Sequence, residues 1–135
     1  MSEKRFCLQC DDGTELVHEA RDLVFNYRDQ TCTVPSVSGW HCPVCAECEF
    51  DAGEGQRYSM VVDSFAATVD TELAASMRAI RKKLGLKQAE AARLFGGGIN
   101  AFSEYERGKT KPPRSTMVLL RLLDKHPELL AEIRS

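Results

Sequence analysis

The chain has 135 residues, 43% hydrophobic and 28% charged, a composition typical of a soluble globular protein. No apolar run approaches the roughly 20 residues that span a bilayer, and the opening stretch MSEKRFCLQC lacks the apolar core of a signal peptide, so we expect a cytoplasmic protein. The net charge of −2 conceals a division, because residues 1–68 carry five Lys/Arg against twelve Asp/Glu and residues 69–135 carry thirteen against eight. We predict two domains with these bounds: an acidic one suited to a basic protein partner and a basic one suited to nucleic acid.

All six cysteines lie in the acidic half, and thiols stay reduced in a cytoplasm unless a metal holds them. Cys7 and Cys10 form one CxxC pair, CLQC, and Cys42 and Cys45 form another, CPVC, 31 residues further on. Two such turns supply four thiolates for a tetrahedral shell, which suits Zn²⁺, although iron also accepts four thiolates. The long spacing fits a ribbon whose two knuckles lie on separate hairpins. We expect one structural zinc ion per chain, because four cysteines leave no open position for catalysis.

Three further residues bear on this ligand set. Cys48 repeats the two-residue spacing after Cys45, so it competes as a ligand, and the symmetric choice is Cys42 with Cys45. Cys32 is expected to be a small strand residue. His41 is expected to be exposed, since residues adjacent in sequence rarely chelate one metal together.

Between the two pairs, the stretch LVFNYRDQTCTV predicts a β-hairpin. Leu23, Phe25 and Tyr27 alternate with other residues, residues 28–30 are polar enough for a turn, and residues 31–34 resume a β-branched pattern. Residues 35–39, with proline, serines and glycine, are expected to interrupt the regular structure of the chain before Trp40. After the second pair, apolar residues recur with helical spacing over 58–65, so the acidic half is predicted to be a small α+β domain that resembles a zinc ribbon. A short polar joint is expected at residues 69–71.

The basic half predicts an all-α domain of five helices. Leu73, Met77, Ile80 and Leu84 share one helical face, and Gly85 ends that helix. A short helix over 88–95 is followed by three glycines, which raise the possibility of a phosphate-binding loop. Such loops follow a strand and usually carry a lysine after the last glycine, and neither condition holds here. The glycines therefore indicate a tight turn between two helices.

The unit that begins at Gln88 has the spacing of a DNA-binding helix-turn-helix. Ala91 and Ala92 fall where the helices cross, and Phe102 and Tyr105 fall on the inner face of the second helix. A plain helical bundle is the alternative, but it does not account for the small residues, the glycine turn and the positive charge together. The loop RGKTKPPR adds cations for phosphates, two later helices complete the domain, and their spare apolar surface suits a homodimer. The predicted DNA-contacting residues are Gln88, Asn100, Ala101, Ser103, Glu104, Arg107, Lys109 and Lys111.

The stretches LGLKQAEAARLFGGGINAFSEYERGKTKPPRST and LLRLLDKHPELL resemble the Xre/Cro-type helix-turn-helix domain of the MqsA (YgiT-type) antitoxins, and CLQC and GWHCPVC resemble their N-terminal zinc domain. The resemblance implies the antitoxin of a type II toxin-antitoxin pair, not an enzyme. Its zinc domain would neutralise an mRNA-cleaving ribonuclease toxin, and its helix-turn-helix domain would dimerise and repress the operon promoter. Cys7, Cys10, Cys42 and Cys45 would hold the zinc. Asn100 would read a base, in keeping with the fit of an amide to adenine.

One position departs from the family pattern, since Glu104 stands where a base-reading arginine is expected. A carboxylate accepts from cytosine and cannot donate to guanine, so we expect a different operator or weaker binding. The alternatives are a zinc-ribbon helix-turn-helix repressor with no toxin partner, and a metalloenzyme, for which the chain shows no acid/base constellation.

Overall fold

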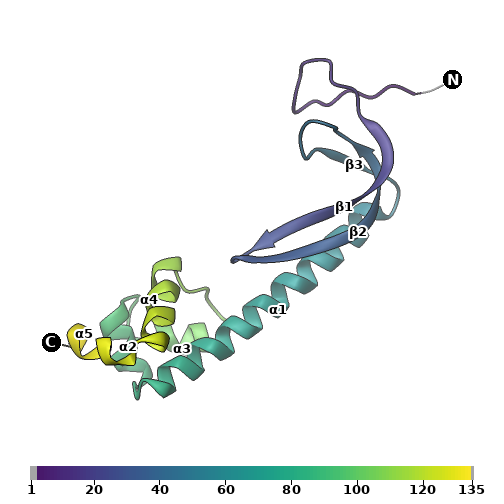
Figure 1. Cartoon of the computed structure of the whole chain (residues 1–135). Helices are drawn as coiled ribbons and strands as arrows, with labels where there is room; N and C mark the ends of the chain where they lie inside the picture. Colours follow the sequence, from purple (N-terminus) through teal and green to yellow (C-terminus); the bar gives the residue numbers. More distant parts are fainter. Residues whose placement is uncertain (1–2, 135) are drawn as a thin grey trace. The chain divides into compact units, whose positions relative to one another are not determined.

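A computed structural model describes residues 3–134 of the chain (Figure 1). The chain divides into two compact units, Met1–Ala67 and Thr68–Ser135. The first unit combines a small sheet with the beginning of a long helix, and the second consists of helices alone. We describe each unit by itself.

The sheet of the first unit is antiparallel, with the strands in the order β1 (Val17–Tyr27), β2 (Gln30–His41) and β3 (Cys48–Phe50). The predicted hairpin is confirmed, and its turn consists of Arg28 and Asp29, whose φ angles of 50° and 66° match the right-handed twist of the strands. Along the end of β1, half-buried and exposed residues alternate as the sequence pattern indicates.

The expected interruption at residues 35–39 is wrong, because β2 runs through all of them. A bulge accommodates Pro35: the register shifts between Arg21 and Leu23, which pair with Val37 and Val34. Ser36 adopts a φ of 50° there, and its amide donates to Asp22 Oδ1 at 2.9 Å. Proline has no amide to offer a strand ladder, and a bulge is one of the few places where a sheet tolerates it.

A single helix, α1 (Glu54–Lys83), follows the sheet, so the predicted joint at residues 69–71 is also wrong. No glycine or proline occurs between residues 56 and 83 to end the helix, and Val69 is buried rather than exposed in a linker. The first turns of α1 pack on the sheet through ring contacts of Tyr58 with Phe50 and of Phe65 with Phe25, at centroid distances of 5.4 and 6.3 Å.

The second unit contains the end of α1, then α2 (Gln88–Phe95), α3 (Ala101–Glu106), α4 (Arg114–Lys125), a 3₁₀ turn η1 (Pro127–Leu129) and α5 (Leu130–Arg134). Its core joins Met77 and Ile80 of α1 to Phe102 of α3 and to Leu120 and Leu123 of α4. The described residues thus form a three-stranded antiparallel sheet and five α-helices, which confirms the predicted fold class. Within residues 3–134, no helix is long and apolar enough to cross a membrane.

Candidate metal centre and DNA-binding surface

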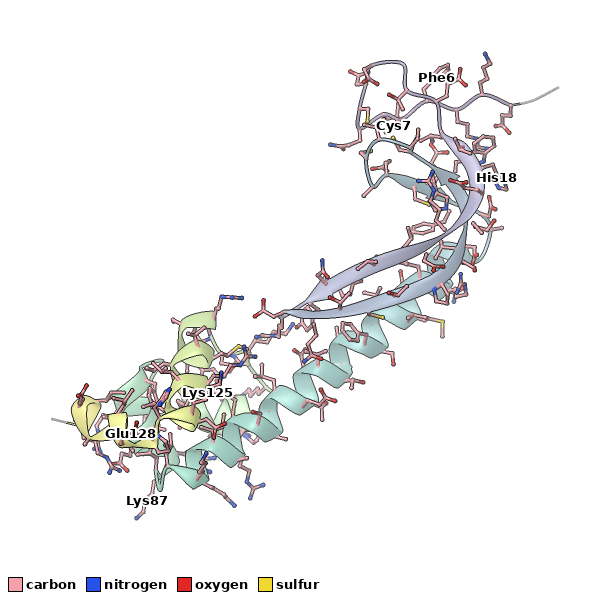
Figure 2. The ribbon with its side chains drawn as sticks, in the orientation of Figure 1. Phe6, Cys7, His18, Lys87, Lys125 and Glu128 are labelled. Atoms are coloured by element: carbon pink, nitrogen blue, oxygen red, sulfur yellow. The ribbon has the colours of Figure 1, made fainter. Side chains whose placement is uncertain are left out.

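Four cysteines from two distant turns meet at one end of the sheet (Figure 2, where Cys7 is labelled beside Phe6). Cys7 and Cys10 lie on the turn before β1, which the Phe6–Glu15 bridge closes, and Cys42 and Cys45 lie on the turn after β2. Their four Sγ atoms all lie within 4.8 Å of one another. The sequence spacing therefore predicted correctly which two turns come together.

The cluster has the dimensions of a tetrahedral thiolate site. Cys7 Sγ lies 3.5 Å from Cys45 Sγ, and Cys10 Sγ lies 3.8 Å from Cys42 Sγ. A tetrahedron with Zn–S bonds of about 2.3 Å has sulfur–sulfur edges of about 3.8 Å, whereas a disulfide needs about 2.05 Å. The cysteines are free thiols, and their separation fits a shared metal ion.

Backbone amides donate hydrogen bonds to some of these sulfurs, which favours the negatively charged thiolate that binds a cation. The amides of Cys45 and Val44 donate to Cys42 Sγ at 3.3 and 3.4 Å, and these hydrogen bonds lower the pKa of that thiol to about 7. The amide of Cys10 donates to Cys7 Sγ at 3.4 Å in the same way. In contrast, the hydrogen bond with Cys45 and burial raise the pKa of Cys10. Four clustered thiolates therefore need a positive charge between them, and a divalent ion such as Zn²⁺ supplies it.

Cys48 lies apart from the four clustered sulfurs. Its Sγ contacts His41 Nε2 at 3.9 Å, and burial raises its pKa. The prediction that His41 is exposed is wrong, since the residue is 2% exposed and its Nε2 lies 2.9 Å from the carbonyl oxygen of Val37. His41 is the last residue of β2 and turns into the unit, where Cys48 of β3 pairs with it. Cys32 is a half-buried strand residue opposite Phe25.

A second candidate site lies on α3 of the helical unit. The residues that we placed at the helix crossing are buried: Ala91 and Ala92 on α2, and Phe102 and Tyr105 on α3. The glycine turn joins the two helices, and Gly97 in it has a φ of 97°. A Cβ atom at Gly97 would lie 3.0 Å from Ala101 Cβ and from Tyr105 Oη, so glycine is needed there for space as well as for conformation.

An ion pair inside the unit fixes the far end of α3, and our sequence reasoning missed it. Arg81 of α1 donates through Nε and Nη2 to the carboxylate of Glu106 at 2.7 and 2.9 Å, and through Nη1 to the carbonyl oxygen of Leu86 at 2.8 Å. The two side chains are only 11% and 4% exposed. The residues are 25 positions apart, so no local spacing indicates that they meet.

Most of the predicted contact residues on α3 face outward. Asn100 and Arg107 are exposed, and Ser103 and Glu104 are half-buried. Asn100 precedes the helix and makes no side-chain capping hydrogen bond, which leaves its amide available. Ala101 is the exception: it is 5% exposed and packs against the glycine turn, so the prediction that it points outward is wrong.

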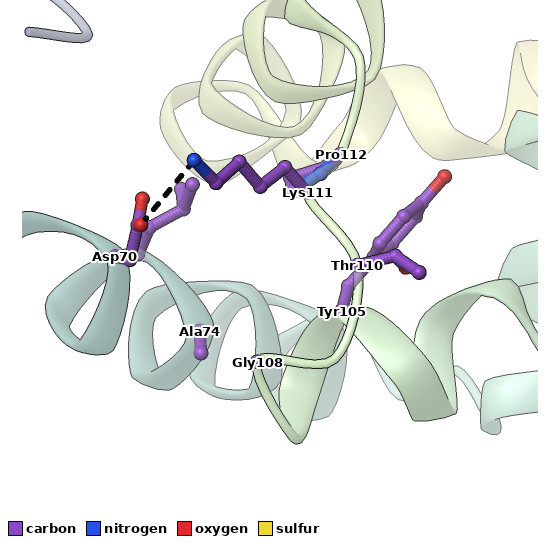
Figure 3. Close-up of a pocket in the computed structure, with 8 residues that line it drawn as sticks. Asp70, Ala74, Tyr105, Gly108, Thr110, Lys111 and Pro112 are labelled. Atoms are coloured by element: carbon purple, nitrogen blue, oxygen red, sulfur yellow. Dashed lines mark ion pairs between the residues drawn. The ribbon is translucent and has the colours of Figure 1, made fainter. Parts of the chain in front are cut away.

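The remaining predicted contact residues flank this helix. Gln88 begins α2 and is half-buried, and Lys109 is exposed in the loop after α3. Lys111 is also exposed, and its Nζ lies 3.7 Å from Asp70 Oδ2, and both residues line a small cavity (Figure 3). The cavity has a volume of about 30 Å³, far below the several hundred Å³ of a small-molecule site.

Comparison with known proteins shows the family to which the chain belongs. The family described as the antitoxin component of the bacterial toxin-antitoxin system, MqsA, matches residues 5–134. Antitoxin MqsA of Escherichia coli (strain K12) is 42% identical over 130 residues, which are 95% of this chain and 98% of that protein. The match to a solved structure of the N-terminal domain of E. coli MqsA covers 49% of this chain and 97% of that one, at 23% identity and a TM-score of 0.44. These matches identify antitoxins and not enzymes, and the chain therefore belongs to the MqsA family of bacterial antitoxin components.

Proposed function

We propose that this antitoxin acts through two surfaces. The first unit, held together by one Zn²⁺ ion on Cys7, Cys10, Cys42 and Cys45, binds and neutralises an mRNA-cleaving ribonuclease toxin. The second unit binds the operator of its own operon as a homodimer and represses transcription. We place this function in the cytoplasm, where the free thiols stay reduced.

The observation that carries the DNA-binding role is the row of polar residues on α3 and at its two ends. Asn100, Ser103, Glu104 and Arg107 recur at intervals of three and four residues, which puts them on one side of a helix. The opposite side of α3 is anchored by buried Phe102 and by the enclosed carboxylate of Glu106. A short polar helix on a rigid base is what a helix-turn-helix protein inserts into the major groove.

The individual side chains suggest how the operator would be read. Asn100 offers a donor and an acceptor to adenine, and the carboxylate of Glu104 accepts from the amino group of cytosine. Glu104 also repels phosphate, so it would face the base edges rather than the backbone. Lys109 and Arg107 are exposed and positively charged, and they would contact phosphates. Lys111 would add a further phosphate contact if it left Asp70.

The charge of the first unit supports a basic toxin as its partner. Its twelve acidic residues exceed its five Lys/Arg. Among these cations, Arg5 pairs with Glu49, Arg21 with Glu19, and Arg57 with Glu54 within the unit. The surplus of acidic residues would complement a basic, RNA-binding protein and speed the association of the two proteins.

On the helical unit, Val118 and Leu122 of α4 are exposed and lie four residues apart, so they would form part of the dimer interface.

The decisive experiment combines one variant with two readouts. Asn100→Ala should abolish sequence-specific binding to DNA from the chain's own promoter, because the exposed amide is lost and no buried contact is disturbed. The same variant should still rescue growth when it is co-expressed with the product of the adjacent toxin gene. If the variant keeps its sequence preference, α3 is not the reading helix. If the unaltered chain rescues no growth, the protein is a repressor without a toxin partner.

A further inference from the structure

An apolar side chain stands beside the polar row on α3. Ile99 is 75% exposed, the largest exposed fraction among the large hydrophobic residues described in the helical unit. It lies between the glycine turn and Asn100, and it precedes Ser103 by the same four residues that separate Ser103 from Arg107. Ile99 thus borders the surface that is proposed to face DNA.

Its neighbours hold the backbone of Ile99 in place. The amide of Ala101 donates to the carbonyl oxygen of Gly98 at 3.1 Å, and that of Glu104 donates to the carbonyl oxygen of Asn100 at 3.0 Å, so hydrogen bonds span Ile99 and continue beyond it. Two and three residues further on, Ala101 and Phe102 are buried in the core. Isoleucine is also stiff at χ1, so little side-chain freedom remains to be lost when it makes a contact.

The chemistry of the major groove offers one apolar feature, the 5-methyl group of thymine. Single exposed apolar residues are common, and exposure alone would say little about Ile99. Ile99 also lies next to Asn100, whose amide is suited to adenine. Because adenine pairs with thymine, this position favours a contact between Ile99 and the methyl group of a thymine. Asn100 and Ile99 together can therefore read the two halves of one A·T pair, or of two adjacent pairs.

We propose that Ile99 is a specificity-determining residue that packs against the methyl group of a thymine in the operator. This inference rests on the DNA-binding function proposed above and adds a base contact to it. Ile99 neither donates nor accepts a hydrogen bond through its side chain, so its contribution comes from apolar burial alone.

The test uses the full-length protein and synthetic duplexes. The preferred site is first selected from random DNA with the unaltered chain. Each thymine in it is then replaced, one at a time, by uracil, which keeps every hydrogen bond and lacks only the methyl group. One replacement should weaken binding about fourfold, the factor expected for burying a single methyl group. In the variant Ile99→Ala, that same replacement should not weaken binding. In Ile99→Val, it should weaken binding, but by less than in the unaltered chain.

The controls separate this inference from the function on which it rests. Both variants should unfold at the same denaturant concentration as the unaltered chain, because the side chain is exposed. If Ile99→Ala responds to every uracil replacement as the unaltered chain does, the methyl contact is refuted and DNA binding stands. If Ile99→Ala instead alters the oligomeric state, Ile99 belongs to a protein interface and the inference is wrong. If the unaltered chain selects no sequence, the DNA-binding function itself fails, and this inference fails with it.

Discussion

Replacement of Glu106 by alanine should destabilise the helical unit severely. The carboxylate accepts two hydrogen bonds from Arg81 and is 4% exposed, so its loss leaves a guanidinium that is 11% exposed without its counter-charge. Breaking a buried ion pair from one side costs about 3 to 5 kcal/mol. A unit of this size has a free energy of unfolding of about 3 to 10 kcal/mol in total, so the change removes a large share of it.

Urea titration followed by far-UV circular dichroism measures this change, because most of the helix lies outside the sheet-containing unit. The single tryptophan, Trp40, lies in the first unit, so its fluorescence should move less. A matched control is Glu90→Ala, which breaks the pair with Arg134 at 3.0 Å. Those side chains are 30% and 44% exposed, and such a pair contributes less than about 1 kcal/mol.

A second comparison distinguishes an unpaired charge from a lost contact. The double variant Arg81→Met with Glu106→Leu removes both charges and keeps apolar volume, so it should recover most of the stability that Glu106→Ala loses. The stabilising role of the buried Arg81–Glu106 pair is refuted if Glu106→Ala shifts the free energy of unfolding no more than Glu90→Ala does. It is equally refuted if the double variant is as unstable as the single one.

Three further outcomes are expected. Cys42→Ser should lose zinc, measured by metal analysis, and should unfold the first unit while DNA binding persists; a folded, zinc-loaded variant would contradict the ligand set. Gly97→Ala should cost about 1 to 3 kcal/mol of unfolding free energy, because φ is 97° and the new Cβ would meet Ala101, whereas an unchanged urea midpoint would contradict this. The hydroxyl of Ser38 donates to Asp51 and lowers its pKa, so this carboxylate contributes stability above pH of about 4 that is lost as the pH falls through the lowered pKa. In an acid titration, Asp51→Asn should not show this loss of stability. An identical acid transition in the variant and in the unaltered chain would contradict the stabilising role of the Asp51 carboxylate.

The parts of the fold that sequence predicted are those fixed by local spacing. The two CxxC turns carry their own geometry, so Cys7 and Cys42 could be assigned to one cluster before the structure was known. The helical period placed Phe102 and Tyr105 inside the core for the same reason. The helical spacing of apolar residues depends only on neighbouring positions in the sequence, so it can be recognised whatever packs against the helix.

The errors occurred where a distant residue decides the outcome. Pro35 stays within a strand because Asp22, across the hairpin, satisfies the amide of the next residue. Arg81 lies beside Glu106 only after α1 and α3 have packed. None of these partners is indicated by spacing along the chain.

The continuity of α1 bears on how the two units can be separated. Every residue from Glu54 to Lys83 is helical, and the boundary between the units, after Ala67, falls inside this helix. Proteases cut exposed loops far more readily than helices, so limited digestion should not release the two halves at that boundary. A fragment that ends there would also begin or stop in mid-helix and leave carbonyl or amide groups without partners. Clean dissection of this antitoxin therefore requires fragments that overlap across the middle of α1.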